Sequence, residues 1–141
     1  MKVRDMMTKQ VIRIHPEEPV EVAARTLTQY NIGALPVCGR NGEIFGMVTD
    51  RDLVIRCMAS GKDAGNVKVQ DVMTQNVVSV APDMDGALAA RIMGREQVRR
   101  LPVVENGKLC GMVSLADLAG QEENVMDAAD ALAEITENIR F

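Results

Sequence analysis

Residues 46–53 read GMVTDRDL, and residues 111–118 read GMVSLADL. These stretches belong to a longer duplication, because residues 3–54 and 69–119 can be aligned with one gap near Asn41. The alignment also pairs two Met-Thr dipeptides, two Ala-Ala-Arg triplets and two Leu-Pro-Val triplets. A tandem repeat of this kind predicts two copies of one small unit related by a pseudo-twofold axis, and the cleft between such copies is a natural ligand site.

The length and composition indicate a globular protein. Each repeat has only about 50 of the 141 residues, which is marginal for burying an adequate hydrophobic core. The two copies are therefore expected to share one core. Hydrophobic residues make up 47% and charged residues 26%, which excludes a disordered chain. The net charge is −4 and aromatic residues make up 2%, which argues against a nucleic-acid-binding surface.

Targeting and metal-binding signals are missing from the sequence. No apolar run approaches the roughly 20 residues of a membrane span, and the first residues lack the apolar segment of a signal peptide. Cys38, Cys57 and Cys110 have no C-x-x-C spacing and are expected to be buried, reduced thiols, as in the cytoplasm. The single histidine, His15, has no Cys or Asp at the spacing of a metal site or catalytic triad.

Each repeat predicts the element order β-α-β-β-α, an α/β (α+β) fold. Short β-rich runs, at 11–14 and 77–80, precede an amphipathic helix, and two further strands follow in each repeat, at 33–37 and 44–48 and at 100–104 and 109–113. Asn106-Gly107 between apolar runs is a strong hairpin signal. We therefore expect repeat one at 1–59, a polar linker at 60–68, repeat two at 69–120 and a C-terminal helix at 121–141.

The helices are predicted from apolar stripes. In repeat one the helix is expected to begin near Pro19, and its buried stripe is Val20, Ala23, Ala24 and Leu27. In repeat two the stripe is Leu88, Ala89, Ile92 and Met93. The tail has apolar residues spaced three and four apart, at Val125, Ala128, Leu132, Ile135 and Ile139. Two heptads are too short to be stable alone, so this seam must pack either on its own chain or at a dimer contact.

The two ends of the repeats carry the sharpest chemical signal. Thr49-x-x-Asp52 and Ser114-x-x-Asp117 each follow a Gly-Met-Val strand and open a helix. One interpretation is a capping box, in which the hydroxyl accepts a backbone N–H and the carboxylate returns the bond. The other adds a ligand, with phosphate at the helix N-terminus and ribose hydroxyls on the carboxylate. The recurrence of the motif favours the second interpretation.

With these motifs the chain resembles CBS domains. The resemblance covers residues 3–119, and the combination of Met-Thr, Leu-Pro-Val and Gly-Met-Val-Thr-Asp-Arg-Asp-Leu is highly specific. The pair looks like a Bateman module, similar to bacterial stand-alone CBS-pair proteins such as the hypoxic response protein type. The resemblance implies a regulatory module that binds an adenosine-containing ligand of the AMP, ATP, NAD or S-adenosylmethionine class and forms head-to-head or head-to-tail homodimers.

The resemblance also implies two nucleotide clefts, each built from both repeats. In the first, Thr49 would contact phosphate and Asp52 ribose, with the remaining side chains supplied by Arg51, Val78, Val98, Arg99 and Arg100. The second and weaker cleft would use Ser114 and Asp117, with Ile12, Ile32 and Ala34 around the base. Arg99-Arg100 aligns with Gly33-Ala34, so the first cleft is expected to be basic and the second nearly neutral.

Two functions remain open from the sequence. The first is a non-enzymatic sensor that binds an adenine nucleotide as a regulatory ligand and signals to an effector protein in trans. The second is a ligand-free scaffold for dimerisation or protein interaction. An enzyme is disfavoured, because the sequence has no paired nucleophile and base, no metal-ligand cluster and no P-loop.

Overall fold

A computed structural model describes residues 1–137 in two compact units, each with its own core. Unit 1 consists of Met1–Val11 and Val78–Phe141, and unit 2 consists of Ile12–Val77. The expectation of one shared core is therefore wrong, because the buried apolar residues form two separate clusters. Each core nevertheless uses both repeats: Val3 belongs to the core of unit 1, and Val69, Val72 and Met73 belong to that of unit 2.

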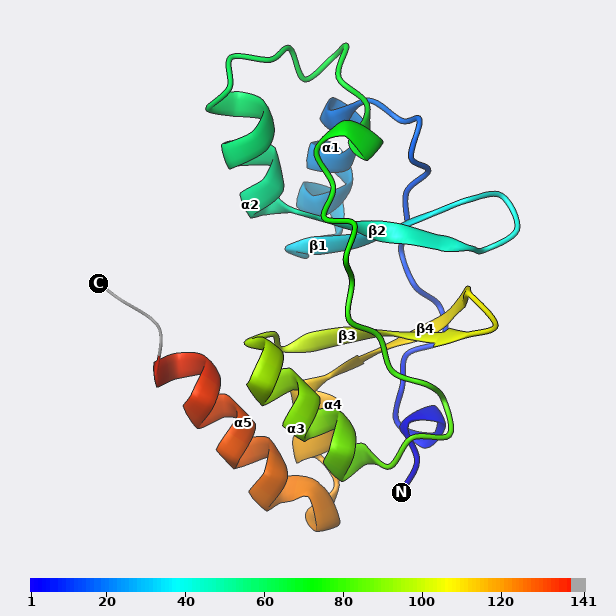
Figure 1. The fold of residues 1–141 in the computed structure, drawn as a ribbon, viewed down its shortest axis with the longest axis vertical. Coiled ribbons are helices and arrows are strands. Elements are labelled where there is room, and N and C mark those ends of the chain that lie inside the picture. Colours follow the sequence, from blue (N-terminus) through cyan, green and yellow to red (C-terminus); the bar gives the residue numbers. More distant parts are fainter. Residues whose placement is uncertain (138–141) are drawn as a thin grey trace. The chain divides into compact units, whose positions relative to one another are not determined.

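Unit 2 is a two-stranded antiparallel sheet with two helical segments (Figure 1). Its elements are α1 Val20–Tyr30, β1 Ala34–Cys38, β2 Ile44–Thr49 and α2 Asp50–Asp52, and a π-helix, Leu53–Met58, continues α2. Pro19 is the N-cap of α1, and Asn31 ends this helix in the left-handed conformation at φ 52°. Val20, Ala23 and Leu27 are buried as predicted, but Ala24 is exposed.

Unit 1 repeats this plan and adds one helix (Figure 1). Its elements are α3 Gly86–Glu96, β3 Arg100–Glu105, β4 Lys108–Ser114, α4 Leu115–Ala119 and α5 Val125–Glu137. Asn106 and Gly107 both have positive φ, at 55° and 76°, which confirms the predicted two-residue hairpin. Leu88, which the pattern predicts in the buried stripe, is instead 40% exposed, so this prediction is wrong.

The expected first strand of each repeat is reduced to one bridge. Ile14 pairs in parallel with Val37, and Val80 pairs in parallel with Val103. The proline that follows each run, Pro16 or Pro82, lacks the N–H that a longer ladder needs.

The Met-Thr dipeptides supply a second partner for each sheet. Thr74 exchanges two backbone hydrogen bonds with Met47 on β2, with N–O distances of 2.8 and 3.0 Å. Thr8 does the same with Met112 on β4, at 2.8 and 2.9 Å. The dipeptide of each repeat therefore docks on the Gly-Met-Val strand of the other repeat.

Two glycines make this docking possible. A Cβ atom on Gly46 would lie 2.5 Å from the carbonyl oxygen of Thr74, and a Cβ atom on Gly111 would lie 2.7 Å from that of Thr8. Both neighbours are backbone atoms, so a side chain at either position would push the docked segment away. This contact accounts for the glycine in both Gly-Met-Val strands.

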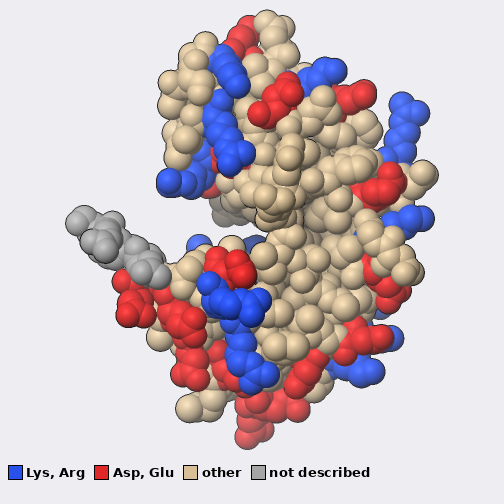
Figure 2. Space-filling view, in the orientation of Figure 1, with Lys and Arg blue, Asp and Glu red and all other residues tan. Residues whose placement is uncertain are grey.

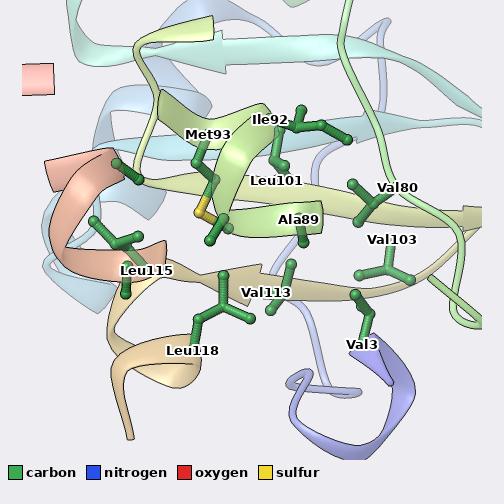
Figure 3. Packing of buried hydrophobic residues seen from close by; sticks show 13 residues of the cluster. Val3, Val80, Ala89, Ile92, Met93, Leu101, Val103, Val113, Leu115 and Leu118 are labelled. Carbon is green, nitrogen blue, oxygen red and sulfur yellow. The ribbon is translucent and has the colours of Figure 1, made fainter. Parts of the chain in front are cut away.

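The tail packs in cis, on α3 and α4 of unit 1. Its buried face agrees only in part with the predicted seam: Ala128 is buried as predicted, but Val125 and Leu132 are 45% and 46% exposed, and Ala131 is buried instead. Ile135 packs partly against the core, as predicted, and Ile139 lies outside the described residues. Figure 3 shows the core that this helix borders, with Val3 pointing toward Val103.

Small residues set the docking of the tail. A Cβ atom on Gly94 of α3 would lie 3.1 Å from the Cα atom of Ala131, so the two helix backbones approach closely at this point. A helix rotated to bury Leu132 would carry its larger side chain into this contact. The small residue therefore faces α3, which is why the three-four spacing alone misplaced Leu132.

Candidate functional site

The end of β2 positions Thr49 and Asp52 in a complete capping box. The backbone N–H of Asp52 donates to Thr49 Oγ1 at 3.1 Å, and the backbone N–H of Thr49 donates to Asp52 Oδ2 at 3.0 Å. The arrangement follows from the sequence. The first N–H groups of a helix have no partner within the helix, and a Thr hydroxyl and an Asp carboxylate three residues apart can accept hydrogen bonds from the N–H groups at this end.

The end of β4 repeats this geometry with different residues. The backbone N–H of Asp117 donates to Ser114 Oγ at 3.1 Å, and that of Ser114 donates to Asp117 Oδ2 at 2.8 Å. Both predicted capping boxes are therefore confirmed. The helices that they open are short, with three residues in α2 and five in α4.

Asp52 is enclosed by side chains that the sequence analysis did not identify. Asp52 is only 7% exposed. The Thr74 hydroxyl lies 3.3 Å from both carboxylate oxygens, and Arg56 Nε lies 3.7 Å from Oδ1. Arg56 follows Asp52 by four residues, a spacing that brings opposite charges together on a helix and could have indicated the pair.

Asp117 is more open. It is half-buried, and within the described part of the chain it takes part in no ion pair. Gln121 occupies the position that corresponds to Arg56, so the repeat supplies no cation there. The two carboxylates have the same capping geometry but different surroundings.

The remaining predicted site residues divide between the units. Ile12, Ile32 and Ala34 are half-buried in unit 2, where Ala34 lies opposite Thr49 in the ladder and Asp50 N–H donates to the Gly33 carbonyl at 3.0 Å. Arg51 is exposed, and its backbone N–H donates to Asp50 Oδ1.

In unit 1 the paired arginines are exposed. Arg100 lies opposite Ser114 in the ladder, and the carbonyl of Arg99 accepts a hydrogen bond from Leu115 N–H at 2.8 Å. Val78 is half-buried and Val98 is 36% exposed. The structure thus brings Ala34 to Thr49 and Arg100 to Ser114, pairs that the resemblance had divided between the two clefts.

The described residues offer neither a metal-binding cluster nor a helix that could cross a membrane. They contain no group of three His, Cys, Asp or Glu side chains that could hold a metal ion. His15 is a half-buried turn residue whose Nδ1 accepts the Glu17 N–H at 3.3 Å. None of the helices in residues 1–137 combines the length and the apolar character that crossing a membrane requires.

The family model for the CBS domain matches residues 3–58 and 69–124. This chain belongs to the CBS domain family. The CBS domain-containing protein YhcV of Bacillus subtilis is 40% identical over 134 residues, which cover 95% of this chain and 94% of YhcV. A CBS pair is a regulatory module, so the family also supplies the general class of function.

Two solved CBS structures share the fold. The crystal structure of Hypoxic Response Protein I with two coordinated zinc ions has a TM-score of 0.78 and 32% identity, and the match covers 86% of this chain and 98% of that one. The CBS domain pair of protein MJ0100, in complex with 5-methylthioadenosine and S-adenosyl-L-methionine, has a TM-score of 0.73 and 26% identity, with 85% and 94% covered.

Proposed function

We propose that this CBS pair is a non-enzymatic sensor of an adenosine-containing ligand. The observation that carries the proposal is the carboxylate–hydroxyl pair at the end of each Gly-Met-Val strand, held in the same geometry in both repeats. A carboxylate accepts the two hydroxyls of a ribose, and such charge-assisted hydrogen bonds contribute about 1.5–3 kcal/mol each. The MJ0100 pair, which binds two adenosyl compounds, supports the same ligand class.

The residues proposed for the principal site come from both repeats of the sequence. Asp52 would accept the ribose hydroxyls, Thr49 and the exposed Arg51 would face phosphate, and Arg99 and Arg100 would add positive charge. Val78 and Val98 would flank the adenine. Because three of these residues are arginines, the site should prefer ligands that carry a phosphate group.

A weaker site is proposed around Ser114 and Asp117, with Ile12, Ile32 and Ala34 against the base. These five residues include no positively charged side chain, so a phosphate group would add little to the affinity of a ligand at this site. AMP, ATP, NAD and S-adenosylmethionine all contain the adenosine that both sites would recognise. The ligand acts as a regulator rather than as a cofactor.

Calorimetry with AMP and adenosine tests the principal site. If the arginines face phosphate, AMP should bind more than tenfold tighter than adenosine, about 1.4 kcal/mol. Arg100→Ala should remove most of this preference and leave adenosine binding unchanged, because ribose recognition rests on Asp52. Equal binding of the two ligands by the unmutated protein would contradict the proposed basic site.

Exposed apolar side chains favour a second function, a scaffold for protein association. Val54, Ile55 and Met58 on the π-helix are 51%, 45% and 72% exposed, and Met126 of α5 is 74% exposed. Such patches mark association surfaces, so we propose a homodimer for either function. Sedimentation should give twice the chain mass of 15.4 kDa. A dimer without a thermal shift in AMP, ADP, ATP, NAD or S-adenosylmethionine would favour the scaffold.

The proposed setting is the cytoplasm, where the module would signal to an effector protein in trans. All three cysteines are free, and Cys38 and Cys57 are buried, which suits a reducing compartment.

A further inference from the structure

The Asp52 carboxylate already has the partners that a ribose would need to displace. A carboxylate offers about four acceptor sites. Thr49 N–H occupies one on Oδ2, the Thr74 hydroxyl lies within 3.3 Å of both oxygens, and Arg56 Nε lies 3.7 Å from Oδ1. About one site is left, so the two hydroxyls of a ribose must compete with at least one of these groups.

Of the groups that contact the Asp52 carboxylate, Arg56 also contacts the most other groups of the protein. Its Nη1 donates to the carbonyl of Met73 at 2.9 Å and to that of Val72 at 3.4 Å, while Nε faces Asp52. One guanidinium thus ties the carboxylate to the segment Val72–Thr74. The planar fork of arginine suits such multiple contacts, whereas lysine offers a point charge only.

The segment that Arg56 holds is the one that completes the sheet of unit 2. Thr74 exchanges its two backbone hydrogen bonds with Met47 on β2, directly beside the Thr49 end of that strand. Anything that moves Arg56 from Asp52 therefore acts on the docking of the opening residues of repeat two on the sheet of repeat one.

The other repeat shows that Arg56 is not needed for the capping box itself. Asp117 keeps its bonds to Ser114 although Gln121 stands in place of Arg56. Arg56 is therefore present in only one of the two repeats. Its role must concern a property in which Asp52 differs from Asp117.

We propose that Arg56 competes with the ligand for Asp52 and couples ligand binding to the docking of Val72–Thr74. This inference rests on the proposed function, since it assumes that ribose binds Asp52. Ligand binding would release Arg56 from the carboxylate and loosen its hold on the segment. Because coupling between two equilibria is reciprocal, a firmly docked segment would weaken the ligand by the same factor.

The test compares Arg56→Gln, which installs the residue of the second repeat, with Arg25→Gln. Arg25 is exposed and its guanidinium contacts Glu21 at 2.6 Å, so this control removes the same charge from the same unit away from Asp52. Adenosine is the better probe than AMP in calorimetry, because it carries no phosphate that would respond to the lost charge. Arg56→Gln should bind adenosine about fivefold tighter than the unmutated protein, and Arg25→Gln should match it.

Hydrogen exchange without ligand supplies the second readout. The amides of Thr74 and Met47 should exchange about fivefold faster in Arg56→Gln than in Arg25→Gln, because the segment has lost its anchor. If Arg56→Gln does not fold, Arg56→Lys carries the same test, with an expected gain in adenosine affinity of about twofold.

The outcomes separate this inference from the proposed function. Adenosine binding by the unmutated protein without a gain in Arg56→Gln, or with a loss, would overturn the competition and leave the sensor standing. Unchanged exchange at Thr74 and Met47 would overturn the coupling. No binding of adenosine or AMP by either protein would overturn the proposed function and this inference together.

Discussion

Unit 1 and unit 2 share one plan but are covered differently. In unit 1, α5 packs on α3, and Ala90 of α3 is fully buried. In unit 2, all of whose residues are described, no α-helix follows the π-helix, only the short 3₁₀-helix Val69–Asp71, and the corresponding Ala24 of α1 is exposed. The second alanine of the Ala-Ala-Arg triplet is therefore buried in unit 1 and exposed in unit 2, whereas the first alanine is buried in both. The difference follows the tail helix, which only unit 1 has, and not the repeat itself.

The two carboxylates differ in the opposite sense. Asp52, in the unit without α5, is enclosed by Thr74 and Arg56, whereas Asp117, in the larger unit, is more open. Unit 1 also carries added negative charge, because the exposed face of α5 is acidic, with Asp130, Glu134 and Glu137. Figure 2 shows acidic side chains gathered over this part of unit 1. A duplicated sequence thus gives one unit with an added cover and one with an added cation.

Removing the tail should produce the largest change in stability, and it should leave unit 1 without its added helix, as unit 2 is. Deleting residues 121–141 uncovers the α3 face around Ala90 and Gly94, and the free energy of unfolding of unit 1 should fall by about 3 kcal/mol. Hydrogen exchange should show the loss of protection in β3 and β4 while β1 and β2 stay protected. Equal loss in both sheets would mean that the units do not respond separately.

The docked Met-Thr segments should be equally sensitive in both units. Gly46→Ala and Gly111→Ala each place a methyl group against a backbone carbonyl, and each should lower the free energy of unfolding by about 1–3 kcal/mol in chemical denaturation. Gly120→Ala is the control, because its nearest neighbour would lie at 3.4 Å and its φ is −70°. A clear difference between the two strand glycines would show that only one segment is firmly docked.

The carboxylates should differ in ligand binding. Asp52→Asn should weaken AMP at least tenfold, about 1.4 kcal/mol, whereas Asp117→Asn should weaken it less than twofold, because the arginines are proposed to serve the first site. Asparagine preserves the volume of the buried Asp52 side chain, so calorimetry reports the lost charge. The reverse ranking would show that the open carboxylate is the principal one.

The smallest expected difference concerns the thiols. Burial raises the pKa of Cys38 in unit 2 and also that of the half-buried Cys110 in unit 1. A raised pKa leaves less thiolate at neutral pH, so alkylation by iodoacetamide should be slow at pH 7 and should accelerate with rising pH, first at the more accessible Cys110. Mass spectrometry of partly labelled protein would reveal the order, and fast labelling of Cys38 at pH 7 would contradict its burial.

Local chemistry made much of the fold predictable. The Asn106-Gly107 turn and the two capping boxes rest on residues within a few positions of one another, and all are present. The ligand contacts of the site residues stay predictions.

Long-range contacts could not be predicted in the same way. Arg56 meets the Met73 carbonyl across 17 positions, and α5 turns Ala131 rather than Leu132 inward because Gly94 of α3 leaves room only for a small residue. Neither fact is visible in a periodic pattern, since each depends on a partner from a distant part of the chain.

The exchanged Met-Thr segments have a consequence for synthesis on the ribosome. Unit 2 is continuous, so it can close once residue 77 has emerged, with Thr74 beside Met47. The first eleven residues must wait until Met112 is made before Thr8 finds its strand. The chain therefore emerges with its beginning unpaired and folds its middle first, and a gene cut between the two repeats would encode halves that each lack the other's opening residues.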